Sequence, residues 1–190
     1  MPLSFSNPSK LLVWAYGLLC PGFGRKFYKM LVNILQLRGN EHILDFGSGA
    51  GVLAKKVIKM LNEEGQLTCL DISPTFLNKA RRKLRKYNNA NFLLGDIRNL
   101  QIEPNSFDII VTSWVLHHLP TEEIMDILKE FNNILKPDGR VVIIEYCHEP
   151  HGISEEALIS LLNANSLKVT YKFRGKNSIL IDSKRENSFH

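Results

Sequence analysis

Residues 43–51 read Ile43-Leu44-Asp45-Phe46-Gly47-Ser48-Gly49-Ala50-Gly51, and this stretch decides the fold. Its two leading aliphatic residues suit a buried strand. Its three glycines suit a tight turn in which bare backbone lies against a ligand. Over residues 52–58, apolar residues recur near the 3.6-residue period and predict an amphipathic helix. The stretch therefore predicts a strand, a ligand-binding turn and a helix in succession.

An acidic residue stands twenty positions beyond the last of these glycines. Asp71 ends the next apolar run, residues 66–70, so we expect it at the carboxyl end of a second strand. A carboxylate there can accept hydrogen bonds from both hydroxyls of a ribose. The glycine spacing is Gly-x-Gly-x-Gly, whereas a dinucleotide fingerprint would need its third glycine at position 52, which is Val52. Taken alone, the turn leaves a plain strand-to-helix connection open.

Further segments follow in order along the chain. A third strand ends in an acid (Ala90-Asn91-Phe92-Leu93-Leu94-Gly95-Asp96-Ile97), and a fourth (Phe107-Asp108-Ile109-Ile110-Val111-Thr112-Ser113) precedes Trp114-Val115-Leu116-His117-His118-Leu119. Leu135-Lys136-Pro137-Asp138-Gly139-Arg140 predicts a turn, and Val141-Val142-Ile143-Ile144-Glu145-Tyr146 a fifth strand. In order and spacing these segments resemble the motifs of the Rossmann-like S-adenosylmethionine-dependent methyltransferases. The likeness is closest to the small-molecule branch that includes the quinone and phospholipid methylases.

The resemblance implies S-adenosylmethionine as cofactor. Asp45 and Gly47 would meet its amino-acid part, where an anion suits an ammonium group. Gly49 and Gly51 would let the chain pass close to the cofactor, and Ser113 would lie near the sulfonium. The implied cofactor-binding set is Asp45, Phe46, Gly47, Ser48, Gly49, Gly51, Asp71, Ile72, Asp96, Ile97 and Ser113.

The same resemblance places the nucleoside. Asp71 would bind both ribose hydroxyls, and Ile72 would pack on the face of the adenine. Asp96 would accept from the adenine amino group, while the backbone N–H of Ile97 would donate to a ring nitrogen. The alternative for both acids is a local role, since an aspartate at a strand end is often a helix cap or a turn former.

The alternation of elements predicts an α/β fold. Strands are expected at 42–46, 66–71, 91–94, 107–112, 140–146, 167–174 and 178–182, and helices at 51–62, 74–87, 121–134 and 154–164. Strand-helix alternation implies right-handed crossovers and a doubly wound, mostly parallel seven-stranded sheet with helices on both faces. The last two strands are joined only by residues 174–177, so an antiparallel hairpin closes the sheet. We expect an arm at 1–38, the cofactor-binding domain at 39–183 and a polar tail at 184–190.

Composition indicates one globular domain. The chain has 190 residues, 44% hydrophobic content and 23% charged residues. Its three widely spaced cysteines build neither a metal site nor a disulfide framework and fit a reducing, cytoplasmic compartment. Six cations fall between positions 79 and 86 on the helix expected at 74–87. They form either a solvated outer face or a surface for an anionic partner, nucleic acid or lipid headgroups.

The first thirty residues are rich in aromatic side chains with interleaved cations. This arm could cover the active site as a lid or rest on a membrane surface, and the alternative is a helix pair packed on the sheet edge. No run reaches the length of a membrane-spanning helix, and no good signal-peptide cleavage site follows the apolar run at 11–20. The expected lid residues are Trp14, Tyr16, Phe23, Phe27 and Tyr28.

Catalysis by this family needs little from the protein beyond placing a nucleophile in line with an activated methyl group. His117 and His118 follow the fourth strand, so either could act as a general base, and family-typical packing at the start of the next helix is the alternative. No metal-ligand constellation is visible. With no cap between the fifth strand and the next helix, an apolar lid suggests an apolar or amphipathic small-molecule acceptor.

The sequence lacks two signatures of nucleic-acid methylases. The nucleobase amino-methylase signature is absent after the fourth strand, where Thr112-Ser113-Trp114-Val115 stands, and no Pro-Cys nucleophile is present. These absences argue against DNA and, with less force, against RNA. Two further classes stay open: a non-catalytic module that keeps the fold to hold a partner, and a nicotinamide-dependent oxidoreductase. Val52 and the terminal hairpin disfavour the oxidoreductase.

Overall fold

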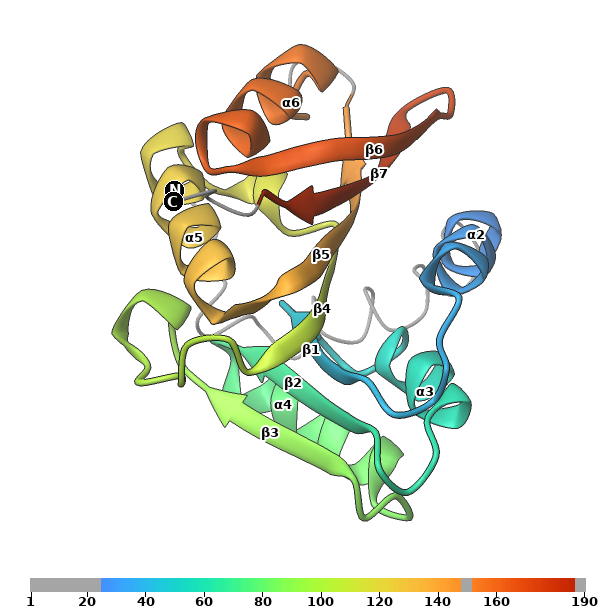
Figure 1. Cartoon of the computed structure of the whole chain (residues 1–190). Coiled ribbons are helices and arrows are strands. Elements are labelled where there is room, and N and C mark those ends of the chain that lie inside the picture. Colours follow the sequence, from blue (N-terminus) through green and yellow to red (C-terminus); the bar gives the residue numbers. More distant parts are fainter. Residues whose placement is uncertain (1–24, 148–151, 187–190) are drawn as a thin grey trace. The chain divides into compact units, whose positions relative to one another are not determined.

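The computed structural model describes residues 25–147 and 152–186, and Figure 1 shows its course. Seven strands form one sheet in the order β3-β2-β1-β4-β5-β7-β6. The predicted mostly parallel sheet, closed by an antiparallel C-terminal hairpin, is confirmed. The chain divides into two compact units, residues 1–96 and 97–190, and each is described by itself. No described helix is long and apolar enough to cross a membrane.

The first unit holds three parallel strands and the helices between them. Its elements are α2 (Arg25–Leu35), β1 (His42–Phe46), α3 (Ala54–Val57), β2 (Gln66–Asp71), α4 (Pro74–Leu84) and β3 (Ala90–Leu94). β2 pairs in parallel with both β1 and β3, and α4 packs on β2 and β3 (Figure 1). Ser73 caps α4, because its side chain accepts the backbone N–H of Phe76 and Pro74 occupies the first turn.

The second unit holds the remaining four strands. Its elements are β4 (Phe107–Ser113), α5 (Thr121–Ile134), β5 (Leu135–Tyr146), α6 (Glu155–Ala164), β6 (Leu167–Arg174) and β7 (Ser178–Arg185), with short 3₁₀ turns at Ile97–Asn99 and Leu116–His118. β4 and β5 are parallel, while β7 runs antiparallel to both β5 and β6. Gly175 donates its N–H to the Ser178 carbonyl at 2.8 Å, which closes the predicted hairpin.

The helix expected at 51–62 is much shorter in the structure. Only Ala54–Val57 is α-helical, followed by a 3₁₀ turn at Ile58–Met60. Residues 51–53 belong to the turn, since Gly51 adopts φ 69°. At the other end Asn62 stops the helix: its side-chain oxygen accepts the N–H groups of Glu64 and Gly65, and its own N–H bonds to the Gly39 carbonyl. These polar contacts end the helix before the point that the spacing of apolar residues predicted.

The turn expected at 135–140 lies inside β5. Leu135 pairs with Phe107 and Arg140 pairs with Ile109, so five steps on β5 match two on β4. The surplus residues bulge, and this bulge contains the proline and the glycine that predicted the turn. β7 likewise continues to Arg185 instead of ending at 182, so two residues assigned to the polar tail belong to the sheet.

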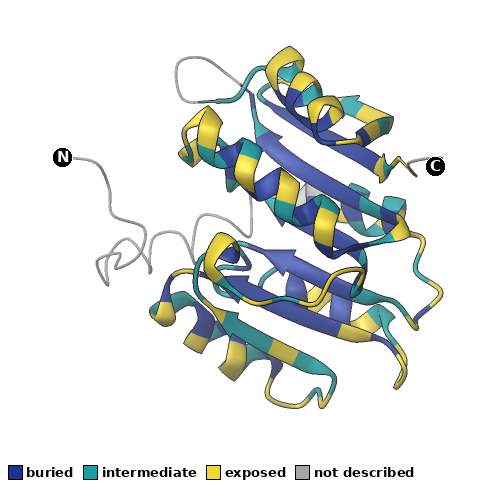
Figure 2. Ribbon diagram, turned by 60° about the vertical axis from the view of Figure 1, so that its left-hand side comes forward, coloured by how far each residue is buried: buried dark blue, intermediate teal, exposed yellow. Residues whose placement is uncertain are grey.

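Helix α2 lies within the segment expected to be an arm. It is amphipathic, and three of its residues are buried: Tyr28, Leu31 and Leu35. Across the described structure the strands are largely buried, while the helices turn an exposed side outward (Figure 2). The part of the arm that the structure describes is therefore a packed amphipathic helix.

Candidate functional site

The glycine turn after β1 is built from left-handed backbone. Gly47, Gly49 and Gly51 have φ angles of 67°, 53° and 69°, a region that side-chain-bearing residues adopt only at a cost. The N–H of Ser48 bonds to the Leu70 carbonyl at 2.9 Å, which ties the turn to the end of β2. The left-handed backbone conformation therefore favours glycine at these three positions, whether or not a ligand binds.

Two of these glycines face different surroundings. A Cβ atom added to Gly49 would meet no protein atom within 4 Å. One added to Gly51 would lie 3.1 Å from both the Cα and the Cβ of Ala80 on α4. Gly49 therefore borders open space in which backbone can approach a ligand. Gly51 allows α4 to pack close to the turn, and its expected place beside the cofactor stays a prediction.

Asp71 organises the turn from the carboxyl end of β2. One oxygen of its buried carboxylate accepts the Gly49 N–H at 2.7 Å, and the other accepts the Ser73 N–H at 2.8 Å. Burial raises the pKa of this carboxyl, and the two backbone hydrogen bonds oppose that rise. The carboxylate thus has a local structural role, and each oxygen retains a further lone pair for a ligand donor.

Asp45, near the end of β1, is a buried acid with an unsatisfied oxygen. It is 1% exposed, and its Oδ2 atom has no hydrogen-bond partner among the described residues. Burial, followed by repulsion from Asp71, raises its pKa to about 8, against a backbone hydrogen bond from Ala54. An unsatisfied buried acceptor needs an explanation, and a donor supplied by a bound molecule or by water gives one. A cationic group fits this acceptor best.

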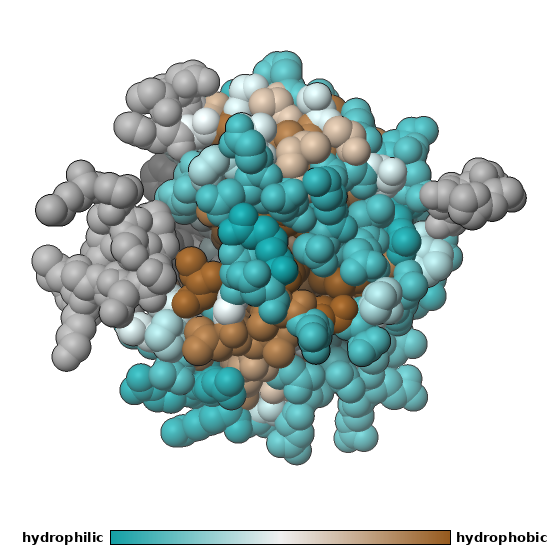
Figure 3. Space-filling view, turned by 90° about the vertical axis from the view of Figure 1, so that its left-hand side faces the viewer, coloured by the Kyte–Doolittle hydropathy of each residue, from teal (hydrophilic) through white to brown (hydrophobic). Residues whose placement is uncertain are grey.

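The expected nucleoside-binding residues follow β2 and β3. Ile72 is 45% exposed, which is unusual for a large aliphatic residue, and Leu94 at the end of β3 is 51% exposed. Figure 3 views the molecule from the side on which the β3 arrow ends in Figure 1, and hydrophobic residues gather there among hydrophilic ones. Asp96 is half-buried and Ile97 is buried. An exposed apolar surface beside a strand-end acid suits the flat face of a purine.

The second unit places polar groups at the carboxyl ends of β4 and β5. Ser113, half-buried, ends β4, and Trp114 follows with φ 61°. A bulky residue in the left-handed region is a strained conformation of the kind that persists where the surroundings enforce it. Here the Trp114 N–H bonds to the Ile144 carbonyl at 2.8 Å, and the next residues bond to Glu145.

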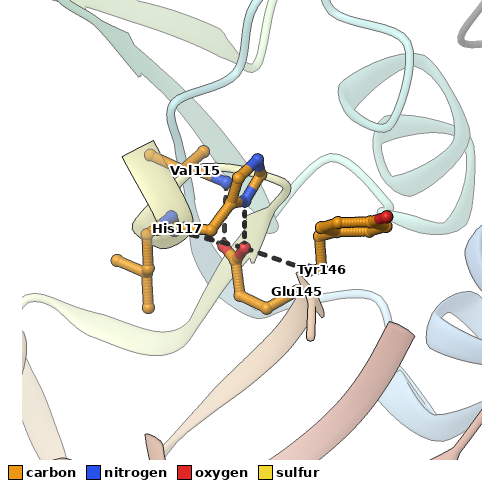
Figure 4. Close-up of polar contacts among 5 residues, drawn as sticks. Val115, His117, Glu145 and Tyr146 are labelled. Atoms are coloured by element: carbon orange, nitrogen blue, oxygen red, sulfur yellow. Dashed lines mark hydrogen bonds and ion pairs between the residues drawn. The ribbon is translucent and has the colours of Figure 1, made fainter. Parts of the chain in front are cut away.

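Glu145 is a residue that sequence reasoning missed. Its carboxylate is fully buried and accepts the backbone N–H groups of Val115 and Leu116 at 2.8 and 2.7 Å, with longer contacts from the backbone of His117 and Tyr146 (Figure 4). The only signal in the sequence is a glutamate at the end of an otherwise apolar strand. Backbone donors of this number compensate the burial of a carboxylate.

The two candidate catalytic histidines differ in their contacts. Nδ1 of His117 lies 2.6 Å from Oε2 of Glu145, whereas the His118 ring lies against the His117 ring at an interplanar angle of 46°, with centroids 3.8 Å apart. Burial lowers the pKa of His118, and the neighbouring His117 lowers it further, against the charge of Glu145. His118 is therefore neutral at pH 7. Within the described residues no cluster of His, Cys, Asp and Glu could hold a metal ion.

The expected lid residues fall mostly outside the described residues. Trp14, Tyr16 and Phe23 lie there entirely, and Phe27 lies on α2 with its side chain outside the description. Tyr28 is 6% exposed and borders a shallow hollow of about 360 Å³ that Lys29, Val32 and Lys56 also line. The described structure therefore leaves the lid as a prediction.

Comparison with known families identifies the core of this arrangement. Residues 43–139 match a family model described as "Methyltransferase domain", and the match spans more than half of the chain. It begins at the strand before the glycine turn and ends within β5. The resemblance inferred from the motifs is confirmed.

Individual relatives agree with the family match. The chain is 30% identical over 132 residues to the ubiquinone/menaquinone biosynthesis C-methyltransferase UbiE of Coxiella burnetii, covering 68% of this chain and 52% of the relative. The chain thus spans about half the length of the curated relatives it matches.

Solved structures share the fold at lower identity. The N-methyltransferase NodS of Bradyrhizobium japonicum, in complex with S-adenosyl-L-homocysteine, has a TM-score of 0.76 at 19% identity and covers 87% of this chain and 89% of its own. A SAM-dependent methyltransferase from Aquifex aeolicus has a TM-score of 0.71 at 21% identity, covering 83% and 89%.

Proposed function

Because the chain belongs to the methyltransferase domain family, we propose that it transfers a methyl group from S-adenosylmethionine to a small apolar or amphipathic acceptor. The single observation that carries this proposal is the pairing of an unsatisfied, buried Asp45 oxygen with open space at Gly49. The two features suit a ligand that brings a cationic group to the end of β1 and lies against bare backbone.

The chain's own residues would divide the binding work. Asp45 would attract the cofactor's ammonium group, while Asp71 would hold the turn and accept from the ribose hydroxyls. Ile72 would pack on the adenine, with Asp96 and the Ile97 N–H at its polar edge, and Ser113 would stand near the reacting group. Bound S-adenosylmethionine supplies an electrophilic methyl group, so the protein has to orient an acceptor and exclude water.

Relatives support the proposed acceptor class. UbiE of Coxiella burnetii is named for C-methylation in ubiquinone and menaquinone biosynthesis, and a quinone precursor is an apolar aromatic molecule. An aromatic segment such as residues 1–24 suits such an acceptor. We propose that this segment forms a lid, with Trp14, Tyr16 and Phe23 facing the acceptor and Phe27 and Tyr28 anchoring the lid on α2.

Charge asymmetry supports a second part of the proposal, contact with an anionic membrane surface. Residues 1–96 hold 14 Lys and Arg against 6 Asp and Glu, whereas residues 97–190 hold 10 against 13. In the first unit Lys83 lies near Lys55 and Lys79, and Lys29 shares a hollow with Lys56. Like charges gathered on α2, α3 and α4 favour anionic headgroups, next to which an apolar acceptor would be found.

Two other activities lead to different binding results. An oxidoreductase would bind NAD, and a non-catalytic module would bind neither a cofactor nor an acceptor. We expect calorimetric titration to give micromolar binding of S-adenosylmethionine and S-adenosylhomocysteine and none of NAD. A screen of methyl acceptors that includes a reduced naphthoquinone would follow. Preference for NAD, or failure to bind S-adenosylhomocysteine, would contradict the proposal.

A further inference from the structure

We propose that His117 is the general base that removes a proton from the methyl acceptor, and that Glu145 positions it for this task. The inference rests on the proposed function, because a base is needed only where methyl transfer goes to an acceptor that arrives protonated. It selects one of two adjacent histidines and adds a residue from another strand.

The side chains of His117 and Glu145 make a short contact. At 2.6 Å, the distance from His117 Nδ1 to Glu145 Oε2 is at least as short as in charge-assisted hydrogen bonds between nitrogen and a carboxylate. A carboxylate can only accept, so Nδ1 must carry the hydrogen. The neutral ring then has its lone pair on Nε2, and Figure 4 shows that ring nitrogen directed away from Glu145.

The hydrogen-bond donors around Glu145 indicate that its side chain is a carboxylate. It accepts backbone N–H groups at 2.7 and 2.8 Å from Leu116 and Val115, and a longer one from Tyr146. A carboxylate satisfies all these donors, whereas a protonated acid would have to turn a hydrogen toward one of them. The backbone therefore holds Glu145 ionised, with one oxygen facing the ring of His117.

The His117 ring is not required to hold residues 115–117 in place. Backbone donors already tie residues 115–117 to Glu145, so the loop does not need the ring for its anchorage. Among the described residues, Nε2 of His117 has no hydrogen-bond partner, and the side chain is 12% exposed. A ring whose inner nitrogen is fixed and whose outer nitrogen is unbonded has the arrangement of an oriented base.

The groups around the ring favour His117 over its neighbour. The ring of His118 lies against it at an interplanar angle of 46°, and the centroid of the Tyr146 ring is 6.1 Å away. Neither side chain is positively charged at pH 7, since burial keeps His118 neutral. A proton on His117 would therefore lie beside a carboxylate and meet no second cationic ring, and the 2.6 Å contact with Glu145 is made by His117.

The step balances in protons and electrons. As the acceptor's bond to hydrogen breaks, Nε2 of His117 takes the proton, and the electron pair left on the acceptor atom forms the new bond to the methyl carbon. The pair of the broken sulfur–methyl bond stays on sulfur. The carboxylate of Glu145 then stabilises the imidazolium.

His117→Asn is the sharpest variant. The asparagine amide can still donate toward Glu145 in place of Nδ1, while Nε2 is lost. With the full chain, radiolabelled S-adenosylmethionine and a reduced naphthoquinone, we expect transfer to fall about a hundredfold to ten-thousandfold. S-adenosylhomocysteine affinity should be unchanged. His42→Asn, on β1, is the matched control and should keep wild-type transfer. Full transfer by His117→Asn would overturn the inference.

Nitrogen-15 NMR of the histidine rings tests Glu145 without any acceptor. We expect the native His117 ring to carry its hydrogen on Nδ1. In Glu145→Gln the amide would donate instead, so the hydrogen should move to Nε2 and transfer should fall. A native ring with the hydrogen on Nε2 would overturn the inference. If the wild type fails to bind S-adenosylhomocysteine, the proposed function falls first, and the role of His117 falls with it.

Discussion

The carboxylate of Asp71 accepts the backbone N–H of Gly49 at 2.7 Å, across 22 positions of the chain. Its second oxygen accepts the N–H of Ser73, which caps α4. One side chain therefore fixes the glycine turn after β1 and the start of the helix after β2. A ligand that lies against the turn depends on Asp71 through this geometry as well as through direct contact.

We expect Asp71→Ala to weaken S-adenosylhomocysteine binding about tenfold to a hundredfold, because the loss of a charge-assisted acceptor costs about 1.5–3 kcal/mol. The melting temperature should fall too, since the buried N–H groups of Gly49 and Ser73 lose their acceptor. Calorimetry and thermal unfolding measure the two effects. Asp71→Asn, which keeps one acceptor oxygen, should lie between. Unchanged affinity in Asp71→Ala would remove this residue from the binding site.

Gly49 and Gly51 offer a matched pair of substitutions. Both have positive φ, so alanine at either position costs about 1–2 kcal/mol of backbone strain. Gly51→Ala should be the less stable of the two, because its methyl group also presses on Ala80. Gly49→Val should fold yet lose cofactor binding, since its side chain enters open space next to the turn. Tight binding by folded Gly49→Val would show that the ligand lies elsewhere.

The buried carboxyl of Asp45 should make stability depend on pH. Its folded-state pKa of about 8 exceeds the usual aspartate pKa of 3.8, so the folded state holds a proton that the unfolded state releases between these values. Its contribution is therefore full at low pH and is lost as pH rises toward 8. Asp45→Asn should raise the melting temperature at pH 8 but not at pH 4. Parallel melting profiles of the two proteins would contradict this assignment.

The same carboxyl should couple cofactor binding to pH in the opposite sense. A cationic amino group favours ionised Asp45, so S-adenosylhomocysteine affinity should rise from about pH 6 to about pH 7.5, before the ligand's amino group titrates. Asp45→Asn should bind more weakly and lose most of this slope. Calorimetry across that range decides between the two behaviours.

Truncation tests the proposed lid. Removing residues 1–24 leaves α2 and its buried Tyr28, Leu31 and Leu35 in place. We expect this protein to bind S-adenosylhomocysteine and to lose methyl transfer, because the pocket would admit water. Removing residues 1–35 should expose apolar surface and cause aggregation. Full transfer by the shorter truncation would exclude the lid.

Sedimentation with vesicles tests the proposed membrane contact. Binding to phosphatidylglycerol vesicles should exceed binding to phosphatidylcholine vesicles and fall with added salt. Replacing the exposed Lys55, Lys56 and Lys59 by glutamate should abolish it. The same triple change at Lys168, Lys176 and Lys184, exposed on or beside the last two strands, is the charge-matched control. Equal binding by both triple variants, or retention of RNA in place of vesicles, would contradict the proposal.

Local chemistry in the sequence determined much of the fold. The aliphatic pair before the glycines, Asp71 at a strand end, Ser73 and Pro74 at a helix start, and the short connection before Ser178 each depend on residues a few positions apart. Backbone sterics, capping and side-chain alternation act over that range, so these elements were predictable. The length of α3 was not, because the side chain of Asn62 ended the helix against its apolar period.

Only the tertiary structure decided what the distant residues do. The contact of Gly51 with Ala80 on α4, which requires a glycine for packing, could not be read from the local sequence. In the sequence, Glu145 is only the glutamate near the end of an apolar strand. Parallel pairing of β4 and β5 places its carboxylate beside the backbone N–H of Val115 and the ring of His117. Such contacts follow from strand order and register, which no local periodicity encodes. The sequence determined which functional groups the protein has, and the strand register determined which of these groups lie in contact.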